Sequence, residues 1–422
     1  MGKELRTPIE FYSRRRDGDC SSNRLRFPVD PNPCIAPAMN LIIETATLAE
    51  FCGRAGKSEY ITVDTEFIRD KTYWPKLCLL QVASADEAVA IDALAPDIDL
   101  APLFDLMVQP HVLKVFHAAR QDIEIFDYLS SRIPTPIFDT QVAAMVCGFG
   151  DSVGYDKLVH ALTKVHIDKS LRFTDWSKRP LAKRMLDYAL SDVTHLRPVY
   201  EKLAAEVAQS NRAAWLDEEM AVLTDPATYR QDPAESWHRV KTRIRKPRHL
   251  AVLRALAAWR EETAQSRDIP RVRVMRDEAL NDIAVHEPKK MGDLQGLRSV
   301  RPDQLGEKRA RELLDVVAAA LALPESEYPK MAQRNTQLGK IGPACDLLKV
   351  LLKLKCEQHK VAQKLVASSD DIEAIARDDD ADVRALRGWR RELYGADALA
   401  LKHGRLAITA NGGALRVIEL DR

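Results

Sequence analysis

The sequence Tyr60-Ile-Thr-Val-Asp-Thr-Glu-Phe67 decides the fold of the first half of this 422-residue chain. Its β-branched and aromatic residues predict a strand. Because side chains alternate between the two faces of a strand, Asp64 and Glu66 are expected to project from the same face. This strand therefore offers two carboxylates to one site.

Two more acidic segments follow, HAARQDIEIF (His117–Phe126) and YALSDV (Tyr188–Val193). Asp122 comes after an apolar run and opens a stretch with apolar residues at helical spacing, which places it near the start of a helix. These apolar residues are Ile123, Phe126 and Leu129. Tyr188 and Asp192 lie four residues apart in a predicted amphipathic helix, so they share one of its faces.

Four carboxylates from three separate segments suit a metal site. Mg²⁺ and Mn²⁺ take oxygen ligands, and two such ions about 4 Å apart can activate a water and stabilise the leaving oxygen of a phosphodiester. Without cations or protons the carboxylates would repel one another. We expect two divalent ions on Asp64, Glu66, Asp122 and Asp192. Tyr188 is expected to position the attacking water or help to deprotonate it.

Each segment taken alone has an ordinary explanation, such as a helix-capping acid or a solvated carboxylate. Together, and in this order, the segments resemble the three motifs of the DEDD exonucleases, and more closely those of the ribonuclease D family. Tyrosine four residues before the last aspartate is typical of the DEDDy variant; the DEDDh variant would have histidine at position 187, which is Asp187. The resemblance continues through DTEFIRDKTYWPKLCLLQVA (Asp64–Ala83) and DKSLRFTDWSKRPL (Asp168–Leu181).

The resemblance implies an α/β, ribonuclease H-like exonuclease domain followed by all-α, HRDC-type helical domains. It implies a 3′–5′ exoribonuclease that releases nucleoside 5′-monophosphates from RNA 3′ ends, with tRNA precursors as the expected substrate. Two alternatives stay open. One is a DNA 3′–5′ exonuclease, since the same chemistry serves either sugar. The other is an RNA-binding protein with a vestigial nuclease site, which the complete acidic set disfavours.

The domain limits follow from changes in pattern along the chain. Residues 1–38 are expected to form a flexible extension, with Met39 hypothesised as the native start. Strands alternate with helices in residues 39–208, the exonuclease domain. A linker is expected at 209–245. Strand patterns fade after residue 209, and only helices are expected beyond it.

Two helical modules are expected after the linker. HLAVLRALAAWREETA (His249–Ala264) and IPRVRVMRDEALNDIA (Ile269–Ala284) resemble an HRDC domain, placed at residues 246–322. CDLLKVLLKLKCEQHKVAQKLVAS (Cys345–Ser368) suggests a second, divergent HRDC-like domain at residues 330–412. Trp237 and Trp259 could stack on bases, although core packing explains Trp259 better.

Residues beside the motifs are expected to shape the substrate groove. Phe67 and Tyr73 could pack against the terminal nucleotide, and Arg179 is expected to contact a phosphate. The full set of candidates is Phe67, Tyr73, Gln81, His117, Trp176 and Arg179. Core packing explains Phe67 and Trp176 equally well.

The net charge of +1 hides an asymmetry. Residues 39–208 carry 18 Lys and Arg against 24 Asp and Glu, a net −6, whereas residues 209–422 carry 38 against 33, a net +5. The segment 239–248 holds basic residues and no acid, which suits a phosphate backbone. An imbalance this small is also ordinary for a protein surface.

Several classes of protein are excluded. No long apolar stretch predicts a membrane span or a signal peptide. Seven scattered cysteines fit reduced thiols in the cytoplasm. The Gly53–Ser58 stretch lacks the first glycine of a phosphate-binding loop and precedes its strand, so no nucleotide cofactor is expected. We expect a monomer.

Overall fold

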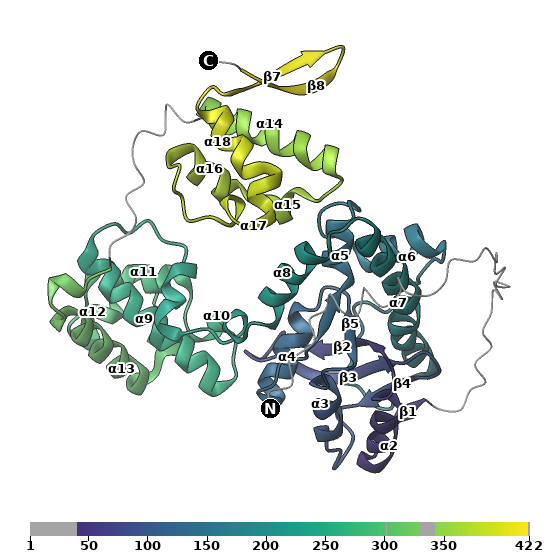
Figure 1. Cartoon of the computed structure of the whole chain (residues 1–422). Coiled ribbons are helices and arrows are strands. Elements are labelled where there is room, and N and C mark those ends of the chain that lie inside the picture. The colour runs from purple at the N-terminus through teal and green to yellow at the C-terminus, as the bar shows by residue number, and fades with distance from the viewer. Residues whose placement is uncertain (1–39, 301, 330–341, 421–422) are drawn as a thin grey trace, which may run out of the picture. The chain divides into compact units, whose positions relative to one another are not determined.

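The computed structural model describes residues 40–300, 302–329 and 342–420, and the extension expected at residues 1–38 lies outside them. The described residues form two compact units (Figure 1). The first comprises residues 40–66, 78–225 and 342–420; the second comprises 67–77 and 226–329. The segment that follows Glu66 therefore belongs with the first helical module, whereas the last module belongs with the sheet.

The first unit is built on a mixed six-stranded sheet. In spatial order its strands are β1 (Leu41–Ile42), β4 (Ala88–Asp92), β3 (Lys76–Ala83), β2 (Tyr60–Ile68), β5 (Leu113–Phe116) and β6 (Ile137–Asp139). β2, β5 and β6 run parallel, and β3 and β4 are antiparallel. The α/β fold and the strand predicted at Tyr60–Phe67 are confirmed. The two-residue β1 was missed, because so short a strand leaves no alternating pattern.

Helix α7 (Lys183–Gln209) covers the face of the sheet that carries the acids. Thr62 Oγ1 donates a hydrogen bond of 2.8 Å to the carbonyl oxygen of Val193 in α7. Thr62, Asp64 and Glu66 are two residues apart along the strand, so their side chains lie on the same face. All three therefore project toward this helix. Seven of the eight residues of β3 are buried, including neighbours on both faces, so the sheet is covered on both sides.

Further helices surround this sheet. They are α2 (Thr45–Ala55), α3 (Ala101–Met107), α4 (Arg120–Ser130), α5 (Thr140–Val146), α6 (Tyr155–Thr163) and α8 (Ala213–Thr224). Asp122 is the third residue of α4, as predicted, and Ile123 and Phe126 are buried. Leu129 is instead 42% exposed, because it lies in the last turn of the helix. Helix α8 falls inside the stretch that was expected to be a linker.

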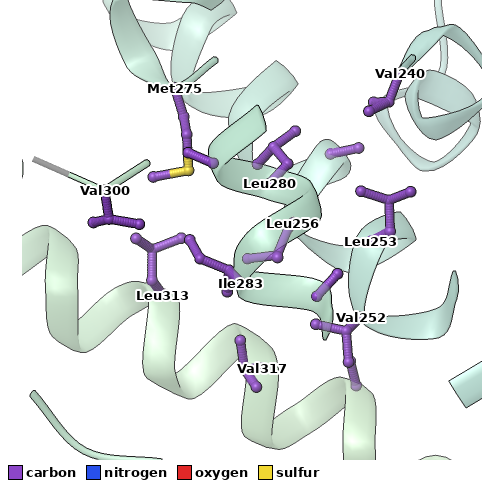
Figure 2. Close-up of a cluster of buried hydrophobic side chains, with 14 of the residues drawn as sticks. Val240, Val252, Leu253, Leu256, Met275, Leu280, Ile283, Val300, Leu313 and Val317 are labelled. Atoms are coloured by element: carbon purple, nitrogen blue, oxygen red, sulfur yellow. The ribbon is translucent and has the colours of Figure 1, made fainter. Parts of the chain in front are cut away.

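The second unit is a helical module with its own core. Its elements include η3 (Pro233–Arg239), α9 (Pro247–Arg267), α10 (Arg271–Val274), α11 (Asp277–His286), α12 (Met291–Gln295) and α13 (Pro302–Ala322). Figure 2 shows Leu256, Ile283 and Leu313 gathered between these helices. Trp237 belongs to this core and Trp259 packs against it. Both tryptophans are thus explained by packing within the module.

The segment Phe67–Leu77 is anchored in this second unit. Tyr73 is 6% exposed, and its hydroxyl donates to the buried carboxylate of Glu261 in α9. Arg271 binds both carboxylate oxygens of Glu261 and lies over the Tyr73 ring. The carboxylate of Asp268 accepts hydrogen bonds from the backbone N–H groups of Tyr73 and Trp74, at 3.0 and 2.9 Å. Tyr73 therefore fastens its segment to α9.

The last module belongs to the first unit. It contains α14 (Gly342–His359), α15 (Gln363–Val366), α16 (Ser369–Arg377), α17 (Gly388–Arg390), the π-helical turn η7 (Arg391–Gly395) and α18 (Ala396–Lys402). Trp389 stacks on Trp215 of α8 with 4.3 Å between ring centroids. Arg390 forms ion pairs with Glu218, at 3.0 Å, and with Glu219. These contacts join the module to α8.

The chain's last described element is a β-hairpin of β7 (Leu406–Asn411) and β8 (Ala414–Glu419). Only helices were expected after residue 209, so this hairpin was missed. Its turn is Gly412-Gly413, both with positive φ, which is the turn chemistry of a two-residue hairpin loop. None of the helices in the described part of the chain combines the length and apolar character that a membrane span requires.

Candidate active site

Three carboxylates from two elements meet at one point of the first unit. Asp64 and Glu66 come from β2, and Asp192 comes from α7. One ligand oxygen of each lies within 4.8 Å of the others. Acids that are 128 positions apart in the chain, Asp64 and Asp192, are thus brought into reach of a common cation.

Asp122 lies beside this group. Its carboxylate is buried and accepts a hydrogen bond from Thr65 Oγ1. Thr65 lies between the two acids of β2 and points to the other face of the strand. The charge of Asp122 is the last of four causes that raise the pKa of Glu66, and the Asp122 carboxylate is not among the three whose oxygens lie within 4.8 Å of one another.

The acids hold protons more tightly than free carboxylates do. Burial raises the pKa of Glu66 to about 9, with further increases from Asp64, Asp192 and Asp122. Burial raises the pKa of Asp192 to about 7. The pKa of Asp64 is raised by burial and then by the charge of Asp192, and that of Asp122 by burial and then by the charge of Asp64. Such a cluster favours a bound divalent cation, which would replace the protons.

Tyr188 lies one helical turn before Asp192 and is half-buried. Burial raises its pKa, and the charges of Asp192, Glu66 and Asp64 raise it further. The phenol therefore keeps its proton at neutral pH. Its ring lies 6.2 Å from that of Trp176.

Several residues of the site escaped the sequence analysis. Tyr155 donates its hydroxyl hydrogen to the main-chain oxygen of Asp192, and the charges of Asp192 and Asp64 help to raise its pKa. Thr65 holds Asp122. Asp139 and Thr140 hold the turn before α4. An acid between a strand and a helix, as in FDT (Phe138–Thr140), is the signal that could have identified Asp139.

Gln81, His117 and Trp176 lie in the first unit. Gln81 and Trp176 are buried, and His117 is half-buried. Gln81 is fully buried, and neither polar atom of its amide has a hydrogen-bond partner among the described residues. The same holds for Nε1 of Trp176, which is 2% exposed, and for Nε2 of His117. Burial lowers the pKa of His117, so its imidazole is neutral.

Arg179 has its donors engaged by the protein. Its Nε and Nη2 contact both carboxylate oxygens of Asp92, at 2.6 and 2.5 Å. It also donates to the carbonyl oxygens of Cys78, at 2.8 Å, and Trp176, at 2.7 Å. This guanidinium joins β3, β4 and the loop before α7. Phe67 is half-buried and is counted, like Tyr73, with the second unit.

Asp187, next to Tyr188, differs from the clustered acids. It is exposed and forms an ion pair of 2.8 Å with Lys183. The helix therefore presents Tyr188 and Asp192 toward the sheet while it turns Asp187 to solvent. The oxygen donors of the clustered acids fit hard divalent cations such as Mg²⁺ or Mn²⁺.

Two family models match the chain. Residues 39–208 match the family model described as 3′-5′ exonuclease, and residues 249–317 match the HRDC domain. The exonuclease domain of this family is metal-dependent, and the acidic cluster suits that requirement.

Relatives match nearly the whole chain. Ribonuclease D of Nitrobacter hamburgensis is 53% identical over 388 residues, which cover 91% of this chain and 100% of the relative. Ribonuclease D of Granulibacter bethesdensis is 48% identical over 383 residues, which cover 90% of this chain and 97% of the relative. The crystal structure of Escherichia coli RNase D, an exoribonuclease involved in structured RNA processing, aligns with a TM-score of 0.77 at 30% identity, over 86% of this chain and 98% of that one. The chain therefore belongs to the ribonuclease D family of 3′–5′ exoribonucleases.

Proposed function

We propose that the chain removes nucleoside 5′-monophosphates one at a time from the 3′ end of RNA at the site formed by Asp64, Glu66, Asp122, Asp192 and Tyr188. The observation that carries this proposal is the meeting of Asp64, Glu66 and Asp192 oxygens within 4.8 Å. The four carboxylates would hold two divalent ions, Mg²⁺ or Mn²⁺. When bound, these ions supply Lewis-acid activation of a water and neutralise charge on the departing oxygen.

Each side chain has a separate task in this scheme. Asp64, Glu66 and Asp192 would hold the ions as carboxylates, so bound cations would displace the protons that the raised pKa values of Glu66 and Asp192 retain near neutrality. Thr65 keeps the Asp122 carboxylate oriented. Tyr188 remains protonated and can hydrogen-bond the attacking water, so it orients the water and does not take its proton.

Near the acids, the substrate is expected to contact further residues of the first unit. Gln81, His117 and Trp176 each carry a buried polar atom without a partner among the described residues, which suits hydrogen bonding to a nucleotide or to a water. Phe67 stays a candidate because it follows Glu66 directly in β2. Tyr73 and Arg179 are left out of the binding set, since their polar groups are used by Glu261 and Asp92.

We further propose tRNA precursors as the substrate and a cytoplasmic monomer as the working form. The substrate follows from the resemblance to the ribonuclease D family. Exposed basic residues near the start of α9, among them Arg243 and Lys246, would hold the body of a structured RNA. Five buried free cysteines, Cys52, Cys78, Cys147, Cys345 and Cys356, are consistent with a reducing compartment.

A gel time course on 5′-labelled single-stranded RNA, with Mg²⁺ or Mn²⁺, tests the proposal. Wild type should give a ladder that shortens from the 3′ end, and Asp192→Asn should nearly abolish it. A loss of about 10² to 10⁴ in rate in Tyr188→Phe would mean that the hydroxyl takes part in proton transfer, and a smaller loss would mean that it only orients the water. Asp187→Asn is the matched control, since it removes an exposed acid beside Tyr188, and it should retain wild-type rates.

Two other outcomes would point elsewhere. Equal or faster degradation of a DNA of the same sequence would favour the DNA exonuclease. An intact RNA that still shifts on a native gel would favour a binding protein with a vestigial site. A wild-type rate in Asp192→Asn would remove the acidic cluster from the chemistry.

A further inference from the structure

The turn between β5 and α4 decides where Asp122 lies. It consists of Phe116–Ala119, and α4 begins immediately after it. Ala118 has φ 61°, in the left-handed region that residues with a Cβ seldom occupy. A backbone in this conformation persists only where its surroundings hold it. We therefore looked for the groups that hold this turn.

The carboxylate of Asp139 holds two backbone N–H groups of the turn. Oδ1 accepts from Ala118 at 3.0 Å, and Oδ2 accepts from Ala119 at 2.8 Å. Oδ1 also accepts from Gln141 and Val142, at 2.8 and 3.3 Å, which caps α5. Asp139 is 2% exposed, so these bonds are shielded from water. One side chain thus ties the start of α4 to the start of α5.

Thr140 holds the other half of the turn. Its hydroxyl donates to the carbonyl oxygen of Phe116 at 2.9 Å and lies 3.0 Å from Nδ1 of His117. Because the single hydroxyl hydrogen is used on Phe116, Nδ1 of His117 must carry the hydrogen of their shared bond. Asp139 and Thr140 together contact all four residues of the turn.

We propose that Asp139 is a positioning residue for Asp122, which sets the direction in which α4 leaves the sheet and hence the place of the Asp122 carboxylate. This inference rests on the proposed function, in which Asp122 holds a cation. Asp122 lies three positions after Ala119, in the first turn of α4, so a shift of the turn moves it directly. Displacement of a reactive group by about 1 Å can cost about 10²-fold in rate.

Two substitutions separate this role from helix capping. Asp139→Asn keeps an oxygen for Ala118, Gln141 and Val142 but places an amide NH₂ against the N–H of Ala119. Asp139→Ser keeps a hydroxyl that can cap α5, yet it is too short to reach the turn. Both variants preserve the cap of α5, but Asp139→Asn loses the bond to Ala119 and Asp139→Ser loses the bonds to both Ala118 and Ala119. If Asp139→Asn fails to fold, Asp139→Ser carries the test.

The measurements use the full chain. Calorimetric titration with Mn²⁺ alone, in the absence of RNA, gives cation affinity, and a short single-stranded RNA gives kcat and KM. We expect cation affinity and kcat each to fall by about 10- to 100-fold in both variants. KM should change less than kcat, because only His117 of the proposed nucleotide-contacting residues lies in the turn. Leu48→Ala is the control, since it truncates a fully buried side chain in α2 and should lower Tm without changing cation affinity or kcat.

Asp122→Asn separates failure of this inference from failure of the proposed function. If Asp122→Asn loses cation affinity and kcat while Asp139→Ser keeps both at wild-type values, Asp139 is only a helix cap and the inference is wrong. If Asp122→Asn itself retains wild-type values, the proposed metal site is wrong at Asp122.

Discussion

The surrounding protein, rather than the chemistry of an isolated carboxylic acid, determines the pKa values of the acidic side chains in the site. Burial is the first cause of each raised pKa, and the charges of the other acids add to it for Glu66, Asp64 and Asp122. A cation removes the repulsion by replacing the protons. Protons and metal therefore compete for the same oxygens.

This competition predicts how pH acts on stability. An acid with a higher pKa in the folded chain than in the unfolded chain binds protons more tightly when folded, so it favours folding at low pH. That contribution is lost as the pH rises from about 4, the ordinary value, through about 7 for Asp192 and about 9 for Glu66. In EDTA, the Tm of wild type should therefore fall over this range relative to that of Glu66→Gln.

Added Mn²⁺ should reverse the trend. The increase in Tm that it causes should grow with pH between about 5 and 9, because fewer protons must be displaced. Thermal unfolding at a series of pH values, with EDTA or with Mn²⁺, checks both statements. Parallel curves for wild type and Glu66→Gln in EDTA would show that this carboxyl has an ordinary pKa.

Arg179 offers a second prediction at the level of one residue. Its bidentate contact with Asp92, whose side chain is 7% exposed, cannot be reproduced by a single ammonium group. We expect Arg179→Lys to lower the free energy of unfolding by about 2 kcal/mol, measured by urea denaturation. Lys178→Arg is the control, because Lys178 is 78% exposed and should tolerate the change. A stable Arg179→Lys with greatly raised KM for RNA would instead assign Arg179 to phosphate binding.

At the scale of elements, close packing requires glycine at one position and leaves room for a larger residue at another. A Cβ on Gly395, in the π-helical turn η7, would lie 2.3 Å from the carbonyl oxygen of Ala385, which the backbone cannot avoid without moving. A Cβ on Gly53, inside α2, would meet nothing within 4 Å. Gly395 therefore has no room for a Cβ, whereas Gly53 can be replaced by a residue that has one.

Alanine substitutions test this difference. Gly395→Ala should lower the free energy of unfolding by about 2 to 3 kcal/mol, because an added methyl group overpacks the turn. Gly53→Ala should raise it by about 0.5 to 1 kcal/mol, since alanine favours the helix. Urea denaturation of both variants measures the two effects. Similar changes in both would mean that the turn at Gly395 adapts at little cost.

The contacts between Tyr73 and α9 would be lost in a chain that ends before α9. Tyr73, Ala264 and Val274 form a small buried cluster, with Trp74 and Trp259 packed against it. Removing residues 246–422 would strip this cluster from the segment that follows Glu66. Substitutions in the full chain are therefore a cleaner test of RNA binding than truncation.

At the scale of the whole molecule, charge is unevenly distributed, with a net −6 in residues 39–208 and +5 in residues 209–422. Arg243 and Lys246 are exposed in the basic segment before α9. Each phosphate contact that is lost should reduce the slope of log Kd against log salt by about 0.7 to 0.9. The double variant Arg243→Gln/Lys246→Gln should reduce this slope by about 1.4 to 1.8 for a structured RNA.

The control removes the same charge elsewhere. Arg311 and Arg377 are each paired with a glutamate four residues earlier on the same helix. Arg311→Gln/Arg377→Gln should leave the slope unchanged. Fluorescence anisotropy at several salt concentrations, in EDTA to prevent cleavage, gives Kd. Equal slopes in the two double variants would exclude a specific role for the basic segment.

The sequence by itself determined the family, the α/β exonuclease fold with helical modules, and the acids of the site. These features depend on local patterns: alternation along β2, helical spacing around Asp122, and the four-residue interval between Tyr188 and Asp192. The helical pattern in His249–Ala264 lies within α9, which extends it by two residues at the start and three at the end.

Only the tertiary structure decided which partners the side chains have. Tyr73 meets Glu261 across 188 positions and Arg179 meets Asp92 across 87, so no local pattern could distinguish these residues from nucleotide contacts. Asp139 likewise reaches back 20 positions to Ala119. Hydrogen bonds of this kind depend on how strands and helices pack, and packing is a property of the whole fold. Local sequence therefore identified the acids, whereas long-range packing decided how they are held.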